Sequence, residues 1–252
     1  MINTLKHYLK SKKSHFQDIC RINNLAISYN SNKNEFGILK SIFAEREYSD
    51  YFPFYKQVNI IDIGAHYGYF SIFAHLNTSS ESKIISVEPN KNNFVNLQKN
   101  IKDCKISNID ILNFAVGGKN GTTKLYKGQN PNHSIIEDYK LANEKTSYQE
   151  IEVKTLEQII KENNINKIDF LKIDCEGAEY SIFENTSKEI FEKITTISME
   201  FHDLKSNIYT PEFLIKTLVE NDFEIVKYNF QKTSCNLNFG KIIGTKVLKA
   251  IK

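Results

Sequence analysis

A strand, a carboxylate and a glycine turn follow one another between Val58 and Gly68, and this combination limits the possible folds of the chain most strongly. The residues leading to Asp62 are mostly isoleucine and valine, which is typical of a parallel strand buried on both faces. Gly64 lets the backbone turn sharply and approach a ligand, and Gly68 lets the next helix begin close to the strand. The stretch indicates either a nucleotide-type cofactor site or a plain strand-turn-helix without a ligand.

Apolar runs and helical stretches alternate after this turn. The predicted strands are 58–62, 83–88, 109–114, 122–126, 151–154, 167–173 and 195–202, and the predicted helices are 68–76, 91–102, 156–163, 177–193 and one that begins at Pro211. The order of strand, helix and strand predicts an α/β fold with a mostly parallel sheet. Segments 223–228 and 241–248 have no helix between them, so we expect them to pair antiparallel.

Two segments depart from this alternation. Residues 1–52 carry apolar side chains at helical spacing before Pro53, which predicts an N-terminal helical cap in front of a domain over 53–252. The cap could mediate a homodimer or cover the sheet. Residues 128–148 are polar and too long for an ordinary connection, so they indicate a lid over a substrate or a mobile insertion, and His133 is a candidate substrate contact.

Composition excludes several classes of protein. The net charge is only +3, from 33 basic and 30 acidic residues, so no nucleic-acid partner is expected. The four cysteines lack CxxC spacing, which predicts neither a zinc knuckle nor a disulfide framework. No segment has the roughly 18 uninterrupted apolar residues of a spanning helix, and the N-terminus has no long apolar core. We expect a cytoplasmic protein without a membrane span.

Four predicted parallel strands end on an acid: Asp62, Glu88, Asp174 and Glu200. Ligands of open α/β sheets bind beyond the carboxyl ends of the strands, so these acids should line one crevice. Any one of them could be a solvated strand end. Four together with the glycine turn favour a binding site.

The position of Glu88 narrows the choice of cofactor. It lies 24 residues after Gly64, where an acid can accept hydrogen bonds from both hydroxyls of a ribose. A nicotinamide nucleotide fits poorly, because GxGxxG is absent and Asp62 would repel a pyrophosphate. S-adenosylmethionine fits better, since it has a sulfonium and an amino group and no phosphate. The antiparallel closing strands also favour the methyltransferase version of the fold.

At these positions the chain resembles the FkbM-type methyltransferases. The similar motifs keep their order and spacing from about residue 56 to 203: Asp62-Ile-Gly64-Ala-His66-Tyr-Gly68-Tyr-Phe-Ser71, Val87-Glu88-Pro89-Asn90, Ala115-Val116-Gly117, Leu171-Lys-Ile-Asp174-Cys-Glu176-Gly177-Ala-Glu179 and Met199-Glu200-Phe-His202. The KID-x-EGAE block is the most specific. The resemblance implies a Rossmann-like, S-adenosylmethionine-dependent O-methyltransferase, commonly acting on sugar or natural-product hydroxyls. His66 departs from the family, which often carries Asn there.

The resemblance also implies how the cofactor is held. Asp62, Gly64 and Gly68 would hold its methionine part, Glu88 the ribose, and the segment 113–116 the adenine. The complete set of cofactor-binding candidates is Asp62, Gly64, Ala65, His66, Gly68, Glu88, Pro89, Asn113, Ala115 and Asp174. Tyr67 and Phe70 could wall the pocket or pack in the core.

Methyl transfer to a hydroxyl needs a group that takes or stabilises its proton. Glu200 and His202 are two residues apart on a predicted strand, so their side chains should point the same way, and Asp174 ends the adjacent strand. These three could supply a general base or coordinate Mg²⁺ or Mn²⁺. They could also be a hydrogen-bonded polar end of the sheet. Glu179 could reach the crevice, whereas Glu176 is expected to stabilise a helix N-terminus.

The leading functional prediction is therefore an O-methyltransferase that modifies a carbohydrate, as a nucleotide-activated sugar or a glycan or capsule unit. Its candidate catalytic residues are Asp174, His202, Glu200 and Glu179. A non-sugar natural product is an alternative acceptor. A non-catalytic adenosyl-binding interaction module is an alternative function.

Overall fold

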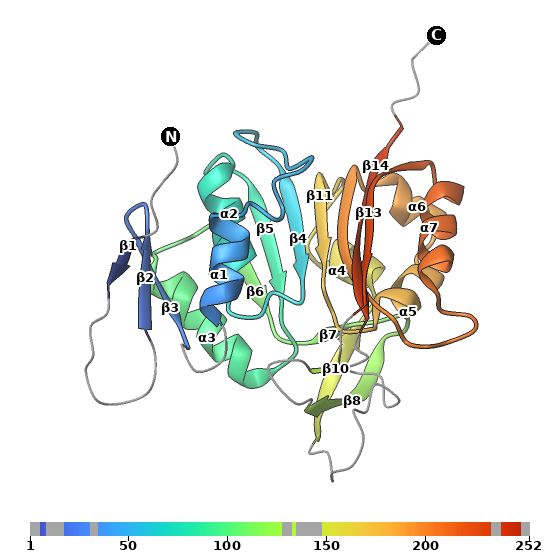
Figure 1. Cartoon of the computed structure of the whole chain (residues 1–252), viewed down its shortest axis with the longest axis horizontal. Helices are drawn as coiled ribbons and strands as arrows, with labels where there is room; N and C mark the ends of the chain where they lie inside the picture. The colour runs from blue at the N-terminus through green and yellow to red at the C-terminus, as the bar shows by residue number, and fades with distance from the viewer. Residues whose placement is uncertain are drawn as a thin grey trace.

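A seven-stranded sheet forms the centre of the protein (Figure 1). The structure is a computed structural model that describes residues 6–8, 18–30, 35–127, 133–134, 148–232 and 238–247. The strand order is β13-β14-β12-β11-β4-β5-β6. The bounds are β4 (Asn59–Ile63), β5 (Lys83–Val87), β6 (Ile109–Leu112), β11 (Phe170–Ile173), β12 (Thr196–His202), β13 (Phe223–Gln231) and β14 (Phe239–Lys246). Strands from β6 to β12 pair parallel, and β14 pairs antiparallel with both β12 and β13. The predicted mostly parallel α/β sheet and its antiparallel closing pair are confirmed.

Helices cover both faces of this sheet. Their bounds are α1 (Glu35–Phe43), α2 (Tyr69–Asn77), α3 (Lys91–Asp103), α4 (Leu156–Glu162), α5 (Glu179–Glu184), α6 (Lys188–Glu192) and α7 (Pro211–Glu220). Successive strand residues point to opposite faces, so Ile60 packs with α1, α2 and α3, whereas Ile61 packs with α4 to α7. The two hydrophobic clusters, one on each face, bury the strands of the sheet. This packing fixes the positions of the carboxyl ends of β4, β5 and β11.

The predicted helix 177–193 is in fact two helices, α5 and α6. Ser187 adopts an extended backbone conformation and its hydroxyl accepts a hydrogen bond from the amide of Ile190, which begins α6. Short polar side chains favour such caps over the helix interior. The apolar residues of α5 and α6 keep one helical spacing across the break, so the sequence pattern predicted a single helix.

The predicted helical cap over 1–52 is wrong for most of its described residues. Strands β2 (Asp18–Ile22) and β3 (Leu25–Tyr29) form a hairpin, β1 (Lys6–Tyr8) pairs with β2, and α1 is the only helix described there. Asn23 has a left-handed φ of 52° between the two strands. Asparagine tolerates this conformation. Two asparagines between two apolar runs are a pattern from which this hairpin could have been predicted.

The hairpin is joined to the rest of the fold by Asn100 on α3. The Asn100 side chain is completely buried, accepts a hydrogen bond from the Ser28 amide at 2.8 Å and donates to the Ser28 carbonyl at 3.1 Å. It also donates to the Tyr67 carbonyl at 3.0 Å. One buried amide therefore links β3, α3 and the glycine turn.

A second sheet lies beyond the carboxyl ends of the main strands. It contains β7 (Ala115–Val116), β8 (Gly121–Lys127), β9 (His133–Ser134) and β10 (Tyr148–Lys154), in the order β7-β10-β8-β9. The predicted lid, 128–148, is described only at 133–134 and at Tyr148, so its role lies outside the described residues. In the part of the chain that the structure describes, no helix is both long and apolar enough to span a membrane.

Candidate active site

The glycine turn after β4 touches the end of β11. Gly64 has a φ of +76°, and a Cβ on it would stand 1.8 Å from the carbonyl oxygen of Asp174. Gly68 has a φ of +82°, and a Cβ there would meet Leu97 at 2.4 Å. Both positions thus combine a conformation that L residues rarely adopt with a lack of space for a side chain. The predicted sharp turn at Gly64 and the helix start after Gly68 are confirmed, and the approach of Gly64 to a ligand stays a prediction.

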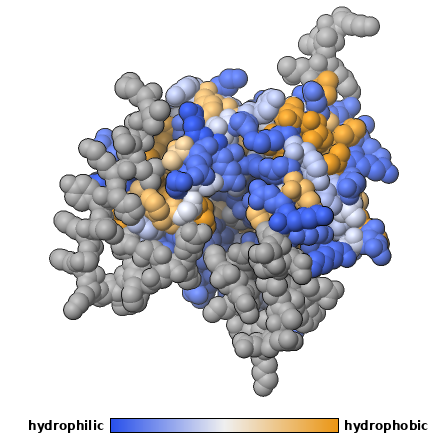
Figure 2. Space-filling view, viewed as in Figure 1, coloured by the Kyte–Doolittle hydropathy of each residue, from blue (hydrophilic) through white to orange (hydrophobic). Residues whose placement is uncertain are grey.

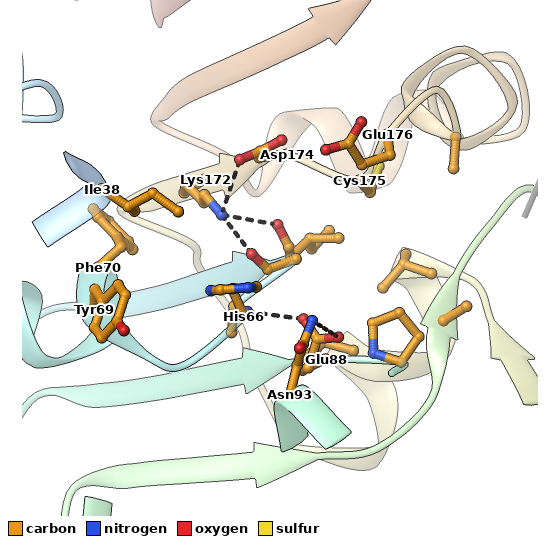
Figure 3. A pocket seen from close by; sticks show the side chains of 18 of the residues that line it. Ile38, His66, Tyr69, Phe70, Glu88, Asn93, Lys172, Asp174, Cys175 and Glu176 are labelled. Atoms are coloured by element: carbon orange, nitrogen blue, oxygen red, sulfur yellow. Dashed lines mark hydrogen bonds and ion pairs between the residues drawn. The ribbon is translucent and has the colours of Figure 1, made fainter. Parts of the chain in front are cut away.

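Lys172 supports this turn through contacts with Gly64, Asp62 and Asp174, and its sequence pattern assigned it no role. Its side chain is 5% exposed, and its ammonium lies 3.2 Å from Asp62 Oδ1 and 3.9 Å from Asp174 Oδ2. It also donates a hydrogen bond to the Gly64 carbonyl at 2.7 Å. Burial opposes the charge of Lys172, but the carboxylates of Asp62 and Asp174 outweigh this and raise its pKa. The ammonium therefore neutralises two acids and fixes the turn between them. Figure 3 shows Lys172 beside Asp174.

Glu88 is held by three hydrogen-bond donors on the other side of the turn. Its Oε2 accepts the backbone amide of His66 at 2.8 Å, and its Oε1 accepts the amide of Asn90 at 2.8 Å and the side chain of Asn93 at 3.4 Å. Burial raises the pKa of Glu88 to about 7, although these hydrogen bonds and Lys172 act to lower it. In Figure 3 the Glu88 carboxylate lies between His66 and Asn93 at the edge of the pocket.

His66 occupies a left-handed position, with a φ of 53°. Asn and His tolerate this conformation better than most residues, which gives a physical reason for the family's Asn at this position. The His66 ring stacks on Tyr67 with centroids 4.4 Å apart, and its Nδ1 lies 3.4 Å from Glu35 Oε2. The Glu35 side chain also accepts a hydrogen bond from the Tyr69 hydroxyl at 3.3 Å. The turn therefore contacts α1 through Glu35 and the end of β5 through Glu88.

An open pocket of about 1000 Å³, part of it solvent, lies over this turn. One end is formed by Glu88, Pro89, Ala115, Val116 and Leu125, and the other by Asp174, Glu176 and Tyr48. Ile38 and Ile42 of α1 also line it, so α1 covers part of the sheet edge. Figure 2 shows apolar residues at the surface over α1, in agreement with the partial burial of Ile38. The lining of apolar side chains with a few charged groups suits a small organic cofactor.

Acidic side chains surround His202 beside the Asp174 end of the pocket. The Nδ1 of His202 is 3.2 Å from Glu179 Oε1, and its Nε2 is 3.2 Å from Glu176 Oε2 and 3.7 Å from Glu200 Oε1. Burial opposes the charge of His202, but the hydrogen bond to Glu179 and the nearby acids outweigh it and raise the His202 pKa to about 10. His202 is therefore a cation at neutral pH.

Glu200 and Asp174 have altered acidity in the same cluster. Burial and the negative charge of Asp174 raise the pKa of Glu200 to about 8. Burial also raises the pKa of Asp174, although Lys172 and His202 oppose this. The Glu200 side chain is 25% exposed, so it can meet a ligand. It belongs to β12 itself and does not end it, because the strand continues to His202.

The structure brings together two of the four acids predicted at strand ends, Asp174 and Glu200, and adds His202 to them. Asp174, Glu200 and His202 each place one ligand atom within 4.8 Å of the other two, as the shared strand face predicted. Asp62 is fully buried under the turn, where it accepts a hydrogen bond from Ser71 Oγ at 2.6 Å. Glu88 lies at the far end of the pocket.

The other predicted site residues divide into those that line the pocket and those that support it. Gly64, Ala65, His66, Glu88, Pro89, Ala115, Asp174 and the wall candidate Phe70 line the pocket. Gly68, Asn113 and Glu179 support it. Asn113 donates its side-chain amide to the carbonyls of Glu88 at 2.8 Å and Pro89 at 3.2 Å, and Glu179 orients His202.

Comparison with known proteins assigns the family. The family model described as Methyltransferase FkbM domain matches residues 62–225, which is more than half of the chain. The chain belongs to the FkbM methyltransferase family. Among curated proteins, Methyltransferase 1 of Beauveria bassiana (strain ARSEF 2860) is 24% identical over 197 residues, which cover 71% of this chain and 78% of that protein. The predicted family is confirmed.

One solved structure shares the fold of this FkbM family member. Trm5b from Pyrococcus abyssi superposes with a TM-score of 0.53 at 11% identity, covering 94% of this chain and 58% of that one. Methyltransferase FkbM from Methylobacillus flagellatus KT gives a TM-score of 0.45 at 14% identity, covering 74% of this chain and 44% of that one. The likeness to Trm5b shows the fold alone, and the predicted Rossmann-like class is confirmed.

The FkbM family member is thus an S-adenosylmethionine-dependent methyltransferase. Its chemistry requires a site for the cofactor and room for an acceptor beside the transferred methyl group. The pocket over the glycine turn is the candidate for both, with Glu88 at one end and the acids around His202 near the other. The contact that each side chain makes with the cofactor stays a prediction.

Proposed function

We propose that this methyltransferase transfers the methyl group of S-adenosylmethionine to a hydroxyl of a carbohydrate, either a nucleotide-activated sugar or a glycan unit. The adenosine lies at the Glu88 end, with its ribose hydroxyls on the carboxylate, and the methionine part passes over Gly64. This orientation directs the methyl group toward Asp174 and Glu200. The carbohydrate acceptor rests on the resemblance to FkbM-type enzymes.

The observation that carries the O-methyl proposal is the pair formed by Glu200 and Asp174. A sugar hydroxyl is a weak nucleophile until a base takes its proton, and a base acts best when its pKa is near the working pH. The Glu200 pKa, raised to about 8 by burial and by Asp174, meets this condition. We assign Glu200 as the general base. His202, which the sequence also offers as a general base, is a protonated positioning group that is held by Glu179.

A divalent metal is the second candidate for this step. The ligand atoms of Asp174, Glu200 and His202 lie close enough for one ion, and oxygen ligands with one imidazole suit Mg²⁺ or Mn²⁺. However, both ring nitrogens of His202 already face glutamates, and an ion would have to displace a strongly held proton. Such an ion would lower the pKa of the acceptor hydroxyl. The base mechanism fits the donor set better.

A transfer assay tests the proposal. The enzyme is incubated with methyl-labelled S-adenosylmethionine and a panel of nucleotide sugars, free sugars and glycans, with and without EDTA. A labelled methyl ether on one carbohydrate supports the proposal, and label on nitrogen or carbon refutes O-methyl transfer. If activity is lost with EDTA and restored by Mn²⁺, the metal replaces the base mechanism.

The predicted lid, 128–148, remains a proposal for binding the acceptor. We expect its deletion to raise the acceptor KM much more than the cofactor Kd. Equal effects on the two constants would show that the segment serves the cofactor pocket or the fold instead.

A further inference from the structure

Two segments outside the family match meet at the pocket. The match covers 62–225, whereas Tyr48 lies before it and Lys241 on β14 lies after it. Tyr48 is 5% exposed and lines the pocket together with Asp174 and Lys172. A site residue is therefore supplied by the segment that follows α1.

Lys241 holds Tyr48 in this place. The Lys241 side chain is 9% exposed, and its ammonium lies 3.9 Å from the centroid of the Tyr48 ring, within cation–π distance. The same ammonium donates a hydrogen bond to the Glu47 carbonyl at 2.8 Å and lies 3.6 Å from Glu47 Oε1. These three contacts fix both the backbone and the ring of the segment. The ring also packs edge-on against Phe70, with the ring centroids 4.9 Å apart.

Strand pairing connects this contact to the reacting end of the pocket. Lys241 stands directly opposite Glu200 in the ladder between β14 and β12, and opposed residues of an antiparallel pair share a face. The Tyr48 ring is thus carried to the face of the sheet on which Glu200 lies. In agreement, burial first, and then the charges of Glu47, Asp174 and Glu200, raise the pKa of Tyr48 well above its usual value.

We propose that Tyr48, clamped by Lys241, is a positioning residue that closes the methyl-transfer end of the cofactor pocket. This inference rests on the proposed orientation of the cofactor. The ring excludes water from the space between the transferred methyl group and the acids, and charges interact more strongly where water is excluded. The turn after α1 is then a part of the active site, which gives the N-terminal segment a function.

Two cofactor analogues test the proposal without a known acceptor. S-adenosylhomocysteine has no group at the methyl position, whereas sinefungin carries a C–NH₃⁺ group there. Calorimetry on the full chain gives the Kd of each. The substitution Tyr48→Leu should raise the Kd of sinefungin by about 10-fold or more and the Kd of S-adenosylhomocysteine by less than about 3-fold. The difference is expected because water then reaches the sinefungin amine, and S-adenosylhomocysteine has no group there. The conservative variant Tyr48→Phe keeps the ring and should restore the wild-type ratio of the two Kd values.

Variants of the clamp give a second readout, whose sign is diagnostic. Removing a cation near the acids would by itself strengthen the binding of the sinefungin amine. Lys241→Met should nevertheless weaken the binding of sinefungin selectively, because the Tyr48 ring loses its cation contact. Lys241→Arg should keep the wild-type ratio of the two Kd values, since a guanidinium also binds aromatic faces. Lys227→Met is the matched control, because Lys227 pairs with Asp50 at 2.5 Å after the same segment without contacting the ring.

The outcomes separate the two claims. Equal losses of both ligands in Tyr48→Leu, or no loss of either, would overturn the role of Tyr48 while leaving the cofactor pocket intact. Tighter sinefungin binding in Lys241→Met would overturn the clamp. If the wild-type chain binds neither ligand, the proposed function fails, and the inference fails with it.

Discussion

Gly64 and Asp174 approach so closely that a Cβ on the glycine would stand 1.8 Å from the aspartate carbonyl oxygen. This contact joins the turn after β4 to the end of β11, which are the two elements that carry the proposed methionine and methyl-transfer sites. This geometry leaves no space for relaxation, because the obstructing atom belongs to the backbone. The position of the turn is thus set by sterics as well as by hydrogen bonds.

The first prediction concerns this contact. Gly64→Ala should abolish binding of S-adenosylhomocysteine in calorimetry and lower the melting temperature, because the new methyl group displaces either the turn or β11. Gly244→Ala is the matched control, since its Cβ would meet atoms no closer than 3.5 Å. Cofactor binding by Gly64→Ala at the wild-type Kd would show that the turn is not a close-approach site.

The second prediction concerns Glu88. Glu88→Gln should weaken S-adenosylhomocysteine by about 10- to 100-fold, because hydrogen bonds to a charged acceptor contribute roughly 1.5–3 kcal/mol. Glu157→Gln, on the exposed side of α4, should leave the Kd unchanged. An unchanged Kd in Glu88→Gln would show that the ribose hydroxyls do not bind to Glu88.

The raised pKa of Glu88, about 7, gives the third prediction, which concerns pH. The ribose hydroxyls need the deprotonated carboxylate as acceptor, so S-adenosylhomocysteine should bind more tightly as the pH rises through about 7. Without cofactor the sign is opposite. The folded-state pKa exceeds that of the unfolded chain, so the contribution of Glu88 to stability is complete below its ordinary pKa and is lost as the pH rises. Binding that weakens across the same range would contradict the assigned role.

The fourth prediction concerns Lys172. Lys172→Met leaves the carboxylates of Asp62 and Asp174 without their buried counter-charge, which should lower the free energy of unfolding by roughly 3–5 kcal/mol in denaturant titrations. Adding Asp62→Asn should recover part of this loss. The control is Lys167→Met, which breaks an exposed ion pair with Asp169 and should have little effect. A small loss in Lys172→Met would mean that one of the acids is protonated in the fold.

Strand order explains why some site residues could be predicted from the sequence and others could not. Glu88 and Asp174 follow apolar runs, so their shared edge followed from the parallel topology alone. Lys172 was overlooked because a charge within a strand suggests an exposed position, and only the fold shows Asp62 beside it. Tyr48 and Lys241 are far apart in the chain, and no local pattern could join them. The left-handed φ of His66 was equally hidden.

The central claim is that Glu200 accepts the proton of a carbohydrate hydroxyl as the methyl group leaves S-adenosylmethionine. The most direct measurement is the pH dependence of labelled methyl transfer in EDTA by the wild type, Glu200→Gln and the exposed control Glu220→Gln. We expect a wild-type kcat that rises to a plateau above pH about 8, as Glu200 loses its proton. We also expect kcat to fall by about 10²- to 10⁴-fold in Glu200→Gln, with the Kd of S-adenosylhomocysteine unchanged. Full transfer by Glu200→Gln, or a rate independent of pH, would contradict it.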